Sequence, residues 1–246
     1  MTIRSRDLPV PGRALAVGAH PDDVEFGAGA TLARWAAAGC EVSMLVATDG
    51  SKGTWDPDAE TETLVATRRA EQGDAAVALG VRGEVVFLGR VDGELVADRE
   101  ATSEVAAAIR RLRPDVLVGH DPWTRHRLHP DHRAAGFLVV EALVAARDPH
   151  FFPDHGLVHH RPRALLLFEA DEADHAETVD RGALEAKIAA LEAHRSQFES
   201  TMAITAADDG AERVRFHRRI GDEAAVAGRR VGRSGAELFA RLPTDR

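Results

Sequence analysis

The chain has 246 residues, of which 44% are hydrophobic and 29% are charged, and its formal net charge is −9. The length and composition are typical of one globular protein and argue against disorder over most of the chain. No Lys/Arg-rich run offsets the negative charge, so nucleic acid is not an expected partner.

Short apolar runs alternate with segments of helical pattern between residues 14 and 168. The runs predicted to be strands are residues 14–19, 41–47, 84–88, 115–119 and 164–168. The segments predicted to be helices are residues 32–38, 63–79, 99–113 and 131–146. Apolar strands that alternate with helices predict an α/β, Rossmann-like fold, in which helices cover both faces of a mostly parallel sheet.

The last third of the chain is predicted to be a C-terminal helical extension of that core. Residues 181–194 and 211–242 have a mostly helical pattern. We therefore expect a single domain, with a core of about residues 13–170 and an extension of about residues 171–246. The scattered histidines His126, His150, His175 and His217 are predicted to lie on the surface.

The N-terminal residues 1–13 are polar, and no stretch of the chain has the length of a signal peptide or a membrane span. A cytoplasmic location is therefore expected. The single cysteine, Cys40, cannot form an intramolecular disulfide and is interpreted as a structural thiol. The sequence leaves the oligomeric state open, and a homo-oligomer is one of the states it allows.

Two similar motifs follow predicted strands. An HPDD motif at residues 20–23 comes directly after the first strand, and an HPDH motif at residues 129–132 follows the fourth. In open α/β sheets, the loops that follow the strands meet beyond the carboxyl ends of those strands. We therefore expect folding to bring the two motifs together around one metal ion.

The donors in these motifs match a catalytic zinc site, which typically has three protein ligands and a fourth position for water. His20 and Asp23 can face one point across a turn, and His132 completes the set. Asp22 then stays unliganded as the general base for the metal-bound water, whose pKa falls to roughly 7. This pattern predicts a metal-dependent hydrolase of amides or esters. Zn²⁺ is the expected metal, and Fe²⁺ is an alternative because it accepts the same donors.

Two other residues of the second motif have predicted catalytic roles. His129, near the metal but not bound to it, is expected to donate a hydrogen bond to the developing oxyanion or to protonate the leaving group. Asp131 is expected to orient one of the histidines. An isolated His-Pro-Asp is more often a simple turn, but two of them at strand ends favour a metal site. His120, which ends the fourth strand, is a candidate for the pocket wall.

These motifs, with several others in the chain, resemble the PIG-L/LmbE-like family of zinc-dependent N-deacetylases. The other matching elements are TDGSKG at residues 48–53, RxxE at 68–71, DGEL at 92–95, HRSQ at 194–197 and AExF at 236–239. The resemblance implies a Rossmann-like fold and removal of an N-acetyl or related N-acyl group from a small N-acetylglucosamine-type conjugate. It implies the same roles for the two motifs and adds Arg68 and Asp92 as substrate contacts. The alternatives are a solvated helix face for Arg68 and an Asp-Gly turn for Asp92.

The loop before the second motif departs from the family pattern. Some members have a tyrosine there, and this chain contains no tyrosine at all. Arg127 stands at about that place, and Arg127, His126 and Trp123 are all candidates for the tyrosine's role. Trp55 and Trp123 lie in loops expected to flank the site, where an indole can stack on a sugar; the alternative for each is local packing. Trp123 and Arg127 are therefore included among the predicted substrate-binding residues.

A nucleotide-binding or non-catalytic Rossmann-like module is the alternative function. Asp49 ends the second strand, where a ribose-binding acid could lie. A dinucleotide site, however, needs GxGxxG after the first strand, whereas this chain has two carboxylates there, which repel phosphate. The chain also lacks the GxSxG motif of serine hydrolases.

Overall fold

The computed structural model describes residues 3–244 and shows an eight-stranded sheet with the strand order β1-β7-β8-β6-β5-β2-β3-β4. The strands are β1 (Ser5–Arg6), β2 (Arg13–Gly18), β3 (Glu41–Thr48), β4 (Val85–Arg90), β5 (Val116–His120), β6 (Ala164–Phe168), β7 (His175–Thr178) and β8 (Ala236–Pro243). The helices are α1 (Asp23–Ala37), α2 (Thr61–Ala78), α3 (Arg99–Leu112), α4 (Pro130–Arg147), α5 (Arg181–Ala193) and α6 (Ala211–Arg229). Short helical turns occupy Pro153–His155, Arg195–Gln197 and Phe198–Met202.

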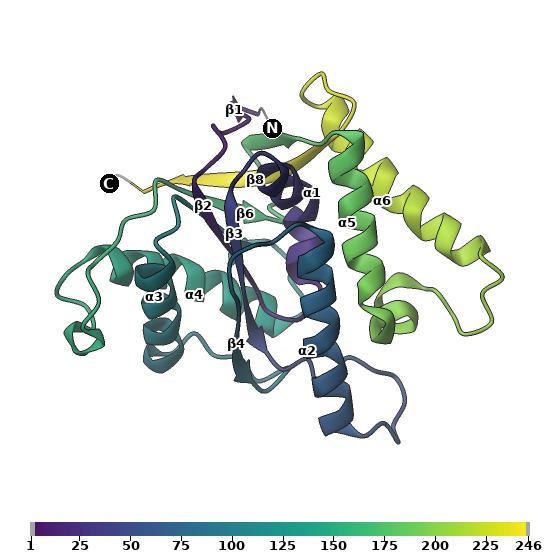
Figure 1. The fold of residues 1–246 in the computed structure, drawn as a ribbon, viewed down its shortest axis with the longest axis horizontal. Helices are drawn as coiled ribbons and strands as arrows, with labels where there is room; N and C mark the ends of the chain where they lie inside the picture. Colours follow the sequence, from purple (N-terminus) through teal and green to yellow (C-terminus); the bar gives the residue numbers. More distant parts are fainter. Residues whose placement is uncertain (1–2, 245–246) are drawn as a thin grey trace.

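Helices cover both faces of this sheet (Figure 1). Along β2, Ala14 and Ala16 pack with α1 and α2 in one apolar cluster, while Leu15 and Val17 pack with α3 and α4 in another. Successive side chains of a strand point to opposite faces, so a strand buried on both sides must be apolar throughout. This requirement explains the continuous apolar runs in the sequence and confirms the predicted α/β class.

All five predicted strands match observed strands to within two residues at each end. The prediction for the C-terminal segment was wrong in the region of β8. Residues 236–243, expected to be helical, form a strand that pairs antiparallel with both β6 and β7. Gly232, which has a φ of 68°, follows the end of α6 and separates it from this strand. The sheet therefore extends into the segment predicted to be a separate helical extension.

One histidine prediction was wrong. His175 was expected on the surface, but it is fully buried on β7, where its Nε2 lies 2.7 Å from Oε1 of Glu177. His126 and His150 are exposed as expected. Within residues 3–244, no helix combines the length and the apolar character needed to cross a membrane.

A buried ion pair between two residues of the C-terminal region forms hydrogen bonds with the backbone of helix α1. The Nζ atom of Lys187 on α5 lies 2.7 Å from Oε1 of Glu237 on β8, and both side chains are buried. Lys187 donates to the carbonyl of Phe26, and Glu237 accepts from the backbone N–H groups of Ala30 and Thr31. In a regular helix the Ala30 N–H bonds to the Phe26 carbonyl. The ion pair therefore satisfies both groups and joins α1 to α5 and β8.

Replacing Glu237 with alanine is expected to lower the free energy of unfolding by about 3 kcal/mol, because it leaves the ammonium of Lys187 buried without its partner. Equilibrium urea unfolding of the purified variant measures this. Glu185→Ala is the matched control, since Glu185 pairs with Arg181 on the exposed face of α5 and is expected to cost less than about 0.5 kcal/mol. Equal, small losses in both variants would show that the buried pair does not anchor α1.

The sheet order places two key loops side by side. Strands β2 and β5 are parallel neighbours, with Ala14 opposite Val116 and Ala16 opposite Val118. Their carboxyl ends therefore lie at the same edge of the sheet. The turn that leads into α1 and the loop that leads into α4 both start from this edge.

Candidate active site

The turn between β2 and α1 has a constrained backbone. Asp22 has a φ of 103°, in the left-handed region that non-glycine residues seldom adopt. The carboxylate of Asp23 accepts a 2.7 Å hydrogen bond from the backbone N–H of His20, which closes the turn. Arg68 on α2 donates to the carbonyl of Pro21 at 2.7 Å and to that of Gly50 at 2.9 Å. The arginine thus ties this turn to the loop after β3.

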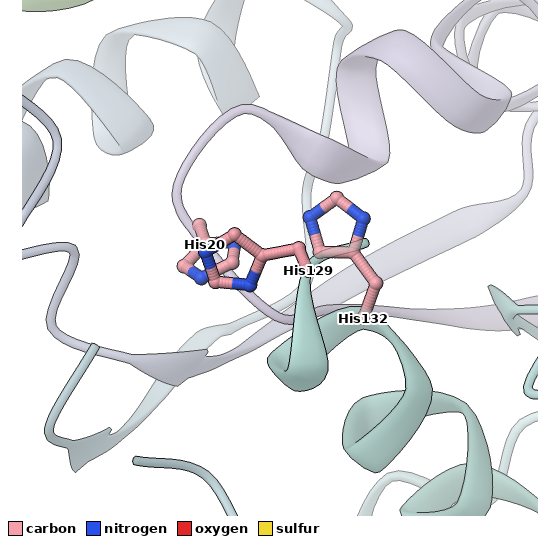
Figure 2. A group of neighbouring side chains, drawn as sticks. All are labelled: His20, His129 and His132. Carbon is pink, nitrogen blue, oxygen red and sulfur yellow. The ribbon is translucent and has the colours of Figure 1, made fainter. Parts of the chain in front are cut away.

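The first turn of α4 carries the second motif. Pro130 occupies the first turn, where its missing N–H is not needed. The Nδ1 atom of His129 accepts a hydrogen bond from the backbone N–H of Asp131, which caps the helix. The rings of His20, His129 and His132 gather between this turn and the start of α1 (Figure 2). The two motifs, more than a hundred residues apart in the sequence, are therefore in contact.

The carboxylate of Asp23 lies at the centre of the donor cluster. Its Oδ2 is 3.3 Å from Nδ1 of His20, and its Oδ1 is 3.2 Å from Nε2 of His132. Metal–ligand bonds of about 2.0–2.2 Å in a tetrahedral zinc site separate neighbouring donors by roughly 3.3–3.6 Å. Both contacts are therefore close to the spacing of ligands around one small cation.

His20 is held by carboxylates on both sides of its ring. Its Nε2 lies 3.1 Å from Asp131 and 3.2 Å from Asp92, which leaves Nδ1 directed at Asp23. Asp131 is fixed in turn by the backbone N–H groups of Gly93 and Leu95. Burial alone would lower the pKa of His20, but the charge of Asp23 and the hydrogen bonds to Asp131, Asp23 and Asp92 raise it to about 12.

The chemistry of this donor set fits a divalent cation. Burial opposes ionisation of Asp23, Asp92 and Asp131, yet the neighbouring histidines and backbone N–H groups hold the pKa of each below its usual value. Several buried negative charges thus surround the histidine nitrogens. Such a cluster favours a positive charge at its centre, which a metal supplies.

Two further residues contact this cluster. His120 was predicted only as a candidate for the pocket wall, and Glu169 was not predicted at all. His120 lies with its Nε2 3.1 Å from Asp23 and its Nδ1 3.2 Å from Glu169. Candidate ligand atoms lie within 4.8 Å of one another in three groups, which are Asp23, His120 and His132; His20, His129 and His132; and His20, Asp92, His129 and Asp131. Glu169 directly follows β6, so its position at a strand end was the available signal. The geometry therefore offers His120 as an alternative to His20 in the ligand set.

Asp22 is buried beside the cluster, and within residues 3–244 no histidine forms a hydrogen bond or ion pair with its carboxylate. Its Oδ2 lies 3.7 Å from the guanidinium of Arg68, and its backbone N–H donates to Gln72. Burial raises the pKa of Asp22 to about 6, against the opposing charge of Arg68. A buried carboxylate of this kind can accept a proton near neutral pH.

His129 presents a hydrogen-bond donor to the site. Because its Nδ1 accepts the Asp131 N–H, the proton of the neutral ring lies on Nε2, which is 4.0 Å from Oδ1 of Asp92. Burial and the charges of His20 and His132 lower the pKa of His129, which favours that neutral form. An N–H donor at this position can stabilise negative charge that develops on a substrate oxygen.

Of the four predicted substrate contacts, two line the cleft and two do not. Arg68 and Asp92 are buried and line the same cleft as the histidine cluster. Arg127 forms an ion pair with Glu169 and lies 3.3 Å from Nδ1 of His132, so its guanidinium is engaged beside the cluster. Trp123 packs edge-on against Phe137 of α4 and is not among the residues that line the cleft.

The cleft extends well beyond the histidine cluster. Its volume is about 680 Å³, within the range of small-molecule sites. Away from that cluster it is lined by exposed or half-buried residues of the loop after β3, the turn at Phe198–Met202 and helix α6, which we call its outer end: Thr54, Trp55, Ser200, Thr201, Arg219 and Glu223. The metal-binding donors lie at the inner end.

Comparisons with known proteins agree with this geometry. The family described as PIG-L, GlcNAc-PI de-N-acetylase, matches residues 15–143. The diacetylchitobiose deacetylase of Thermococcus kodakarensis is 34% identical over 189 residues, which are 76% of this chain and 70% of that protein. A 1D-myo-inositol 2-acetamido-2-deoxy-alpha-D-glucopyranoside deacetylase of Streptomyces avermitilis is 35% identical over 61% of this chain and 59% of its own length. The structure of N,N'-diacetylchitobiose deacetylase from Pyrococcus horikoshii, with its inhibitor MPG, superposes with a TM-score of 0.83 at 29% identity and covers 95% of this chain and 85% of its own.

Proposed function

Because this chain belongs to the PIG-L family of GlcNAc-PI de-N-acetylases, we propose that it is a metal-dependent hydrolase that removes the N-acetyl group from an N-acetylglucosamine-type conjugate. The observation that carries the proposal is the meeting of His20, Asp23 and His132 at the inner end of a cleft, with Asp22 beside them. Folds of this class support many reactions, so the reaction is inferred from the residues of the site and not from the fold.

His20, Asp23 and His132 would hold the metal, which we propose to be Zn²⁺. A divalent cation in this position supplies Lewis acidity, by which it polarises an amide carbonyl and acidifies water. Asp131 orients His20, since its carboxylate lies 3.1 Å from Nε2 and leaves Nδ1 as the ligand atom. His120 plays the corresponding role for Asp23.

The remaining residues move protons and position the substrate. Asp22 accepts a proton from the attacking water, because its carboxylate lines the cleft and its burial raises its pKa to about 6. His129 donates from Nε2–H to the substrate oxygen on which negative charge develops, or to the departing amine. Arg68 holds the turn that presents Asp22 and borders the cleft, where we propose that it also contacts the substrate with Asp92.

We propose that the whole chain is a single domain. Its substrates are small amino-sugar conjugates. The sheet supports a single domain, because β8 from the C-terminal part pairs with β6 of the core. Lys187 and Glu237 join the same two parts through α1.

Purified protein with a defined metal is expected to release acetate from at least one N-acetylglucosamine conjugate. The panel should include N,N'-diacetylchitobiose, an N-acetylglucosamine–inositol conjugate and free N-acetylglucosamine. Chelation should abolish the release, and one equivalent of Zn²⁺ should restore it, because the site depends on the cation for water activation. An absence of acetate release from every conjugate by metal-loaded protein would remove the proposed function.

A further inference from the structure

The outer end of the cleft contains an exposed tryptophan for which the fold gives no structural reason. The side chain of Trp55 is 78% exposed and lines the cleft. Within the described chain, no aromatic ring or guanidinium stacks on it, whereas Trp123 packs on Phe137 and Trp35 is fully buried. An indole left largely in water loses the burial that usually stabilises this side chain.

The loop that carries Trp55 is anchored close to the indole. Gly53 lies so close to Arg68 that a Cβ there would be 2.2 Å from the guanidinium, and the Gly53 carbonyl accepts a 3.0 Å hydrogen bond from Gln197. The hydroxyl of Thr54 accepts a hydrogen bond from the Asp56 N–H, which shapes the following turn. The backbone next to the indole is thus fixed before a ligand arrives, which lowers the entropic cost of binding.

Polar side chains share the outer cleft with this indole. Ser200 and Thr201 offer hydroxyls, and Arg219 and Glu223 on α6 offer a charged donor and a charged acceptor. A flat apolar surface among hydrogen-bonding groups matches a polyhydroxylated ring, which has an apolar face of C–H groups and hydroxyls at its edge. An apolar ligand group would form no hydrogen bonds with these polar side chains.

We propose that Trp55 forms an outer subsite in which its indole stacks on a second polyhydroxylated ring, a sugar or a cyclitol, attached to the acetylated sugar. This inference rests on the proposed function for the position of the acetylated sugar, and it assigns the selection of the attached ring to Trp55. The inner end of the cleft then recognises the acetamido group. The outer end distinguishes conjugates from the free monosaccharide.

The kinetic test compares N,N'-diacetylchitobiose with free N-acetylglucosamine. Trp55→Ala is expected to raise KM for the disaccharide about 5- to 10-fold, the size of a lost aromatic stack, with kcat within twofold. Its kcat/KM for the monosaccharide should stay within twofold of wild type, and Trp55→Phe should lie between wild type and Trp55→Ala. Phe151→Ala, which removes an aromatic ring from a distant loop, is the control and should match wild type. Equal losses on both sugars, no loss, or a loss found only in Trp123→Ala would overturn the proposal.

A binding measurement separates this proposal from the proposed function. Titration of the protein with chitobiose, the two-ring compound that lacks both acetyl groups, should change the tryptophan fluorescence, and Trp55→Phe should remove that change. If acetate is never released but this fluorescence change is present and depends on Trp55, the subsite stands and the deacetylase proposal fails. A fluorescence response that is absent from wild type, or that persists in Trp55→Phe, counts against the subsite.

Discussion

Replacing His132 with glutamine is expected to lower the affinity of the chain for its divalent metal by more than about 100-fold, beyond the 10- to 100-fold that loss of an outer partner costs. The imidazole Nε2 lies 3.2 Å from Asp23 and is the only ligand that α4 contributes to the proposed set. Purified wild-type protein is expected to contain close to one metal ion per chain. Elemental analysis and titration of the metal-free protein measure both quantities.

His132 is a suitable position for this test because its loss should not disturb folding. The side chain is partly exposed in the first turn of α4, and the helix is capped by His129 instead. His159→Gln is the matched control, since His159 is exposed in a distant loop. Both variants should unfold at the wild-type temperature when metal-free, and only His132→Gln should lack the metal.

The same measurement decides whether His20 or His120 completes the ligand set with Asp23 and His132. If His20 completes the set, His20→Gln should lose the metal as His132→Gln does, while His120→Gln should weaken binding by about 10- to 100-fold. The reverse order would identify Asp23, His120 and His132 as the ligands. Wild-type metal content in all three variants would show that no metal is held by these histidines.

The sheet could be predicted from the sequence where burial alone determines the pattern. Residues 164–168 match β6 at both ends, because a strand covered on both faces must be apolar throughout. The region of β8 could not be predicted in this way. The run Ala236–Pro243 contains good helix formers and only partly alternates in burial, and its strand conformation depends on pairing with β6 and β7.

The part of the site that depends on residues at strand ends and on ligand chemistry could be predicted from the sequence. The two motifs at residues 20–23 and 129–132 were expected to meet, and the structure brings them into contact. The contact between His120 and Asp23 depends on the pairing of β2 with β5, which the sequence does not contain. The difference between Trp55 and Trp123 likewise depends on the paths of two loops, so sequence alone could not show which indole lines the cleft.

Replacing Asp22 with asparagine is expected to lower kcat by a factor of about 10² to 10⁴ while the metal stays bound, the range expected for loss of a general base. Asparagine has almost the same shape, tolerates positive φ better than most residues, and keeps the backbone N–H that donates to Gln72. Steady-state kinetics with the metal content measured on the same samples provides the test. Asp74→Asn on the exposed side of α2 is the control and should retain wild-type kcat.

The stability of the Asp22→Asn variant should not fall with its kcat, so a loss of catalysis can be distinguished from a folding defect. Burial raises the folded-state pKa of Asp22 to about 6, above the value of about 3.9 expected for an unfolded chain. The unfolded state therefore releases this proton more readily, so stability falls as the pH rises from about 4 to about 6, and this loss is complete above that range. The neutral amide removes that penalty, and metal-free Asp22→Asn at pH 8 should be at least as stable as wild type. A slow variant that is also less stable would point to a distorted turn, and a variant with wild-type kcat would exclude Asp22 as the base.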